Sequence, residues 1–117
     1  MMSCTIFYKG ALKEKYSQLD VLHVVTQHVR HMNAEITQSD PSIIIHFLHG
    51  KSEPLVLDFK SKSVDGFCKW NGESPEEFYG IFDLFLDLKP LFRSLRIEDD
   101  GGLWHEYTLQ KGHAKSN

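Results

Sequence analysis

Seven histidines in a chain of 117 residues are the first feature of this sequence that could do chemistry. A zinc site needs three or four nitrogen, sulfur or oxygen ligands that converge on one ion. His28 and His31 are three residues apart in a segment with helical periodicity, so they share a helix face. His46 and His49 have the same spacing in an extended segment, where it points side chains to opposite faces. We therefore expect no metal site and no cofactor.

The acidic stretch 98–102 ends in two glycines and has the carboxylate density of a calcium-binding loop. It lacks the interleaved D-x-D-x-D-G register and the late glutamate of such loops. Aspartate and glycine tolerate left-handed backbone angles, so a hairpin turn explains the composition. We expect this turn to join a strand at 95–97 to a strand at 103–109.

Nucleophilic catalysis has little support in the sequence. Cys4 and Cys68 show no metal-binding or redox spacing. The neighbouring Lys69 could lower the pKa of the Cys68 thiol, but a small buried hydrophobe is the commoner role of such a cysteine. No serine lies in a G-x-S-x-G context, and no glycine-rich phosphate loop opens a helix. We predict no catalytic residue and expect a binding protein rather than an enzyme.

Trp104 favours a protein-binding surface. If 103–109 is a strand, alternation places Trp104 and Glu106 on one face, next to the acidic turn. Aromatic anchors dominate interaction hot spots, and acidic rims steer cationic partners. The predicted partner surface consists of Trp104, Glu106, Glu98, Asp99 and Asp100. A Trp104 side chain packed at the periphery of the core is the alternative.

The strands that would position these residues are rich in β-branched and aromatic side chains and are bounded by turn residues. Before the acidic turn they are predicted at 4–8, 34–37, 43–48, 55–60 and 67–70. The near-continuous apolar run of 43–48 indicates a strand covered on both faces. The segment 55–60 alternates apolar and polar residues, which is typical of a strand with one buried face.

Two helices are predicted from capping residues and periodicity. The first covers 17–32, where Ser17 and Asp20 have the spacing of a capping box. The second covers 74–88 and begins with a Ser-Pro pair, the usual order of a cap and a first-turn proline. A proline two residues beyond this helix ends it. Its apolar stripe contains Phe78, Ile81, Phe82, Phe85, Leu88 and Phe92.

This order of elements lacks the strand–helix alternation of a parallel α/β sheet. We predict an α+β fold, in which a mainly antiparallel sheet of about five to seven strands carries two helices on one face, in the order β-α-β-β-β-(β)-α-β-β. The composition, 41% apolar and 25% charged, is that of an ordinary globular domain. We expect 1–110 to form a single domain and 111–117 a flexible C-terminal tail.

Charge and targeting features narrow the function. The formal charge is −3 and the basic residues are scattered, so we expect no binding to nucleic acid or to a membrane. No signal peptide or membrane span is apparent, which predicts a cytoplasmic protein. We expect a small bacterial protein–protein interaction module that binds another protein or forms a homodimer, with an immunity or inhibitor protein as one version. The alternative is a small-molecule binding domain or enzyme, with a pocket between the sheet and the first helix that uses His28, His31 and His46.

Overall fold

A computed structural model describes residues 2–48, 53–72 and 76–115. The strands in these residues are β1 (Met2–Leu12), β2 (Ala34–Ser39), β3 (Ser42–Phe47), β4 (Leu55–Lys60), β5 (Ser63–Gly72) and β6 (Phe92–Asp99). The helices are α1 (Gln18–Val29), α2 (Glu76–Leu88) and α3 (Leu103–Lys115), with a short 3₁₀ turn, η1 (Lys89–Leu91), after α2. None of the described helices is long and apolar enough to span a lipid bilayer.

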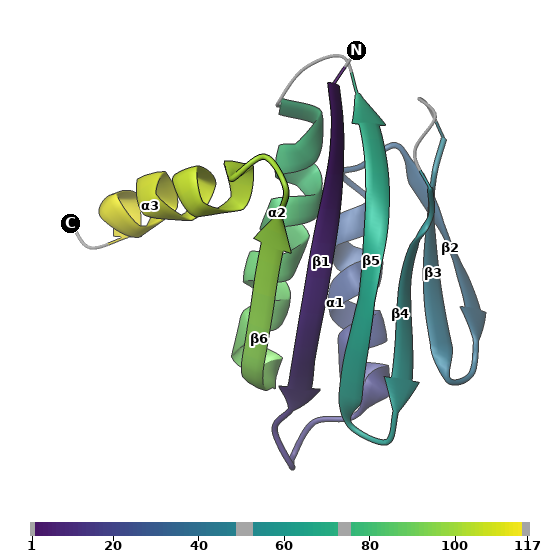
Figure 1. The fold of residues 1–117 in the computed structure, drawn as a ribbon. Coiled ribbons are helices and arrows are strands. Elements are labelled where there is room, and N and C mark those ends of the chain that lie inside the picture. Colours follow the sequence, from purple (N-terminus) through teal and green to yellow (C-terminus); the bar gives the residue numbers. More distant parts are fainter. Residues whose placement is uncertain (1, 49–52, 73–75, 116–117) are drawn as a thin grey trace.

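The six strands form one sheet in the order β2-β3-β4-β5-β1-β6, and every neighbouring pair is antiparallel. Helices α1 and α2 lie side by side behind this sheet, whereas none of the described helices covers the face toward the viewer in Figure 1. The predicted α+β fold, with a mainly antiparallel sheet and two helices on one face, is confirmed.

The core lies between the sheet and these two helices. Helix α1 buries Val21, Val25 and Val29, whose four-residue spacing keeps them on one side of the helix. Valine is a poor helix former, so packing against the sheet stabilises this helix more than its own propensity does. The apolar stripe predicted for the second helix is buried on α2 at Phe78, Ile81, Phe82, Phe85 and Leu88. Its last predicted member, Phe92, is also buried but belongs to β6.

Local sequence explains where the two core helices start and stop. The carboxylate of Asp20 accepts a hydrogen bond of 2.8 Å from the backbone N–H of Ser17, as the predicted capping box requires. Helix α2 ends at Leu88, two residues before Pro90, as predicted. The Ser-Pro pair at 74–75 lies outside the described residues.

Strand β3 differs from the prediction in its surroundings. Its apolar run indicated a strand covered on both faces, but only Ile43 and Ile45 are buried, while Ile44 between them is half-buried on the other face. The reason is that helices cover only one side of this antiparallel sheet. An apolar residue therefore lies on the uncovered face.

The prediction of a closing hairpin is wrong, because 103–109 belongs to helix α3. The carboxylate of Asp99 accepts hydrogen bonds from the backbone N–H groups of Leu103 at 2.9 Å and Trp104 at 2.8 Å. These are N–H groups of the first helical turn, which have no partner within the helix. The residues from Asp99 to Gly102 therefore join β6 to a helix. Their composition alone suggested a turn between two strands. Helix α3 also includes residues 111–115 of the predicted tail.

Helix α3 leaves the sheet at the end of β6 and is held to α2 by aromatic contacts (Figure 1). The Trp104 ring packs edge-on against Phe82 with centroids 5.4 Å apart, and Tyr107 stacks on Tyr79 at 4.5 Å. The Tyr107 hydroxyl also donates a hydrogen bond to the carboxylate of Asp83. Trp104 and Tyr107 are three residues apart on a helix, so both side chains face α2. In the predicted strand they would have pointed to opposite faces.

Candidate functional site

The candidate site is the face of the sheet opposite α1 and α2, which we call the open face. Along β1, Ile6 and Tyr8 point into the core, so Phe7 between them points to the open face. Phe67 on β5 lies directly opposite Phe7 in the β1–β5 register. The two side chains are 47% and 63% exposed, and their ring centroids are 6.2 Å apart. This pair is an exposed apolar contact between two inner strands of the sheet.

Charged residues surround the phenylalanine pair on three strands. Lys9 on β1 lies opposite Asp65 on β5 and opposite Arg96 on β6. The guanidinium Nε of Arg96 contacts the Glu98 carboxylate at 2.9 Å. All four charged side chains are exposed, so the ion pair adds at most about 1 kcal/mol to stability. The open face therefore carries both signs of charge.

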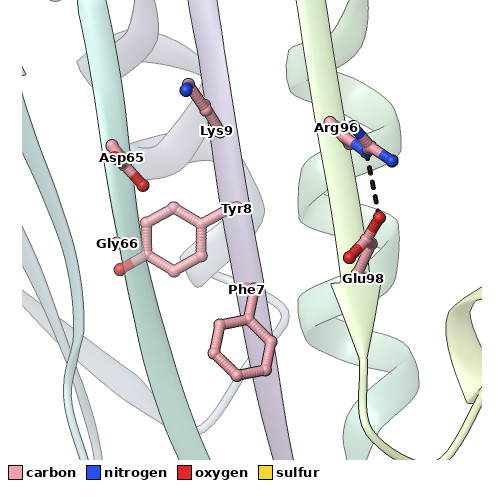
Figure 2. A pocket seen from close by; sticks show the side chains of 7 residues that line it. All are labelled: Phe7, Tyr8, Lys9, Asp65, Gly66, Arg96 and Glu98. Atoms are coloured by element: carbon pink, nitrogen blue, oxygen red, sulfur yellow. Dashed lines mark hydrogen bonds and ion pairs between the residues drawn. The ribbon is translucent and has the colours of Figure 1, made fainter.

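Two shallow hollows lie on this face. One, of about 300 Å³, is bordered by Phe7, Lys9, Asp65, Arg96 and Glu98, as Figure 2 shows. A second hollow of about 700 Å³ continues along β1 from Lys9 and reaches the β4 side of the sheet. Both are open to the surface and are lined by residues of neighbouring strands.

Tyr8 and Gly66 also line the first hollow. The Tyr8 ring lies on the helix side of the sheet over Gly66, and its hydroxyl donates a hydrogen bond of 2.6 Å to the carbonyl of Val56 on β4. A Cβ atom at Gly66 would lie 2.9 Å from the Tyr8 hydroxyl oxygen, so glycine is needed here. Burial raises the pKa of this hydroxyl, which keeps it protonated as a donor. Tyr8 thereby ties β1 to β4 across β5.

The five residues of the predicted partner surface do not form one exposed patch. Glu98 is exposed on the open face and Glu106 is exposed on α3, whereas Trp104 is partly buried against Phe82. Glu98, Asp99 and Trp104 do border a groove of about 410 Å³ between β6 and α3. The placement of Trp104 on an open strand is wrong, because its segment is helical. Peripheral core packing, the stated alternative, describes its contacts.

Asp99 and Asp100 are engaged within the chain. Besides its bonds to helix α3, Asp99 accepts a hydrogen bond from the Gly101 N–H at 3.1 Å and one from the Cys4 thiol at 3.3 Å. Asp100 accepts a hydrogen bond of 3.1 Å from the backbone N–H of Thr5. These two carboxylates join β1, β6 and α3, so they are less available to a partner than the sequence suggested.

Cys4, Asp99 and Asp100 bring three possible metal ligands within 4.8 Å of one another, a grouping that the sequence did not predict. Burial raises the pKa of the Cys4 thiol to about 12, and the hydrogen bond to Asp99 acts in the same direction. The bonds to Asp99 and Asp100 already explain the cluster as a structural junction.

Cys68 is also unsuited to act as a nucleophile. It is fully buried on β5, and burial raises the pKa of its thiol to about 12, with Glu53 acting in the same direction. The suggested lowering by Lys69 does not occur, because the Lys69 side chain points to the opposite face of the strand. Both cysteines are free thiols.

The structure does not bring His28, His31 and His46 together. His28 lies between α1 and α2, where its Nδ1 is 3.0 Å from an Asp87 carboxylate oxygen and its Nε2 is 3.0 Å from the Gly80 carbonyl oxygen. Asp87 and Gly80 belong to α2, so these two contacts of the His28 ring hold α1 and α2 together. His31 is exposed in the turn after α1, and His46 is exposed on the open face. The sheet separates His28 from His46, and His49 lies outside the described residues.

Sequence reasoning missed the residues of the open face. Alternation along 4–8 could have indicated Phe7, since it falls between two residues expected in the core. Phe67 was included in a predicted strand, but its partner across the sheet depends on the strand order, which local sequence does not specify. Comparisons with protein families, with curated proteins and with solved structures found no match to this chain.

Proposed function

We propose that this chain is a protein–protein interaction module and that the open face of its sheet is the interface. The observation that supports this most is the Phe7–Phe67 pair, two large apolar side chains that are exposed at the centre of a sheet face without a helix cover. Burial of such a side chain contributes about 1.5 to 3 kcal/mol when it leaves water. Natural interfaces place aromatic anchors of this kind at the centre and polar groups at the rim.

The charges around the phenylalanine pair fit a partner surface that carries both positive and negative groups. Lys9 and Arg96 lie near Asp65 and Glu98, so the rim has no excess of acid. This favours a mixed surface over the strongly basic toxin or nuclease that an immunity protein would cover. A cytoplasmic location is part of the proposal, and the two free buried thiols fit a reducing compartment.

A photo-crosslinking amino acid at position 67 tests the proposed interface inside cells. Phe67 is exposed, so its replacement by a benzoyl-phenylalanine should be tolerated, and we expect a discrete crosslinked protein adduct on gels after irradiation. The matched control is position 19, because Leu19 is 58% exposed on the other side of the molecule, on α1. It should give no such adduct.

The identity of the adduct is read by mass spectrometry, and thermal unfolding shows that both labelled chains fold. A folded chain that forms no protein adduct from position 67, or that forms the same adducts from position 19, would contradict the proposed function.

A further inference from the structure

One row of charges crosses the open face from β6 to β4, with its positive members on one side of the line between β1 and β5 and its negative members on the other. Lys9 on β1 and Arg96 on β6 lie opposite each other on one side of this line. Asp65 on β5 lies opposite Lys9 on the other side. Asp58 on β4 precedes Phe59, which pairs with Val64, so the antiparallel register places Asp58 next to Asp65 in the same row. The sequence of charges across the four strands is therefore two positive and then two negative.

We propose that the partner of the open face is a second copy of this chain, bound face to face about a two-fold axis that runs parallel to the strands between β1 and β5. The proposal rests on the proposed function, because it names the protein that the same surface binds. A two-fold interface requires each surface to be complementary to itself.

The cross-strand pairs meet this requirement. Such an axis exchanges the β1 and β5 sides of the face and leaves each residue at the same height along the strands. Lys9 then faces the partner's Asp65, and Asp65 faces the partner's Lys9, because the two residues are directly opposite in the β1–β5 register. For the same reason Phe7 faces the partner's Phe67. Each favourable contact forms twice.

The strands next to β1 and β5 extend the match. The axis exchanges β6 with β4, since these strands flank β1 and β5 on either side. Arg96 on β6 therefore faces the partner's Asp58, which adds two more contacts of opposite charge. Both residues border the larger hollow on the open face together with Lys9 and Asp65. The sheet thus presents four attractive charge contacts around four phenylalanine rings.

The face has a suitable size for a dimer. Strands about 4.8 Å apart give the four strands that this axis superposes, β4, β5, β1 and β6, a width of roughly 19 Å, and a strand as long as β1 extends over about 35 Å. A footprint of this scale is comparable with the roughly 800 Å² that each partner contributes to a standard interface. Two sheets packed about 10 Å apart would bury both phenylalanine pairs in a sandwich core.

Charge reversal tests the proposed geometry. In Lys9→Asp the new aspartate would face the partner's Asp65, and in Asp65→Lys the new lysine would face the partner's Lys9. Each variant alone should dimerise at least about tenfold more weakly than the wild-type chain, measured by sedimentation velocity over a concentration series. A 1:1 mixture of the two variants should recover a heterodimer, since opposite charges then meet at both contacts.

Lys13→Asp and Glu14→Lys are the controls, because they make the same charge changes at exposed positions in the loop between β1 and α1. Both should dimerise like the wild-type chain. Thermal unfolding of all four variants separates weaker association from weaker folding.

Each outcome decides between the two proposals. A wild-type chain that stays monomeric, while crosslinking from position 67 captures a different protein, would overturn the second-copy proposal and leave the proposed function standing. A monomeric chain without any adduct from position 67 would overturn both. A wild-type dimer whose two charge-reversal variants fail to recover on mixing would overturn the axis between β1 and β5.

Discussion

Phe82→Ala should lower the free energy of unfolding by about 3 to 5 kcal/mol, because the substitution leaves a cavity in the core. Phe82 is fully buried and contacts both rings through which α3 packs, Trp104 at 5.4 Å and Tyr107 at 5.6 Å. Its loss therefore weakens the core of α2 and the docking of α3 together. Urea unfolding, followed by circular dichroism, gives the change in free energy. Phe85→Ala should cost a similar amount, since Phe85 packs on Tyr8 at 5.5 Å.

Phe67→Ala is the matched control for these substitutions. It removes the same side chain from a position that is 63% exposed, so the expected change in the monomer is within about 0.5 kcal/mol. The comparison is made at a protein concentration low enough to avoid association, because dimer formation adds to apparent stability. A Phe82→Ala variant that unfolds like the wild-type chain would show that the assigned core is wrong.

Asp99→Ala should cost about 2 to 3 kcal/mol and detach helix α3, because the carboxylate caps the helix with charge-assisted hydrogen bonds. The backbone N–H groups of Gly101, Leu103 and Trp104 all donate to it. Loss of the cap should expose the Trp104 ring, which is read as a red shift of tryptophan fluorescence in the folded protein. Chemical denaturation measures the accompanying loss of stability.

Asp100→Ala tests whether this effect belongs to the cap and not to the acidic turn in general. Asp100 is exposed and accepts one hydrogen bond from the Thr5 N–H, so its loss should cost less than about 1.5 kcal/mol and leave Trp104 fluorescence unchanged. Equal effects of the two substitutions would contradict the assignment of Asp99 as the cap.

The fold could be predicted largely from local sequence, because the decisive patterns are local. The capping box at Ser17 and Asp20 and the phenylalanine stripe of α2 depend on residues a few positions apart. Hydrophobic periodicity specifies which side of a helix is buried before any tertiary contact is known. The two core helices and the antiparallel sheet follow from such patterns.

Helix α3 could not be predicted in this way, because its start depends on a contact that competes with a turn. The residues from Asp99 to Gly102 favour a hairpin by composition, and the alternation that follows them fits a strand. The helix is selected by the bonds of Asp99 and by the aromatic contacts of Trp104 and Tyr107 with α2. Tertiary packing overrides the local preference here.

The candidate site was missed for a related reason. Phe7 and Phe67 are 60 positions apart, and only the pairing of β1 with β5 places them in contact. The charge pairs of the open face likewise depend on strand register, which the long-range fold determines. The number of histidines suggested a pocket that uses them. In the structure His28 joins α1 to α2, and His46 lies on the opposite face of the sheet.

The most direct test of the open-face interface is a dilution series of the wild-type chain followed by amide resonances in two-dimensional NMR. We expect concentration-dependent shifts that cluster at Phe7, Lys9, Asp65 and Phe67, with no change at exposed positions of α1 such as Leu19. Shifts that cluster on α1 or α3, or spectra that are identical at every concentration, would contradict self-association through the open face.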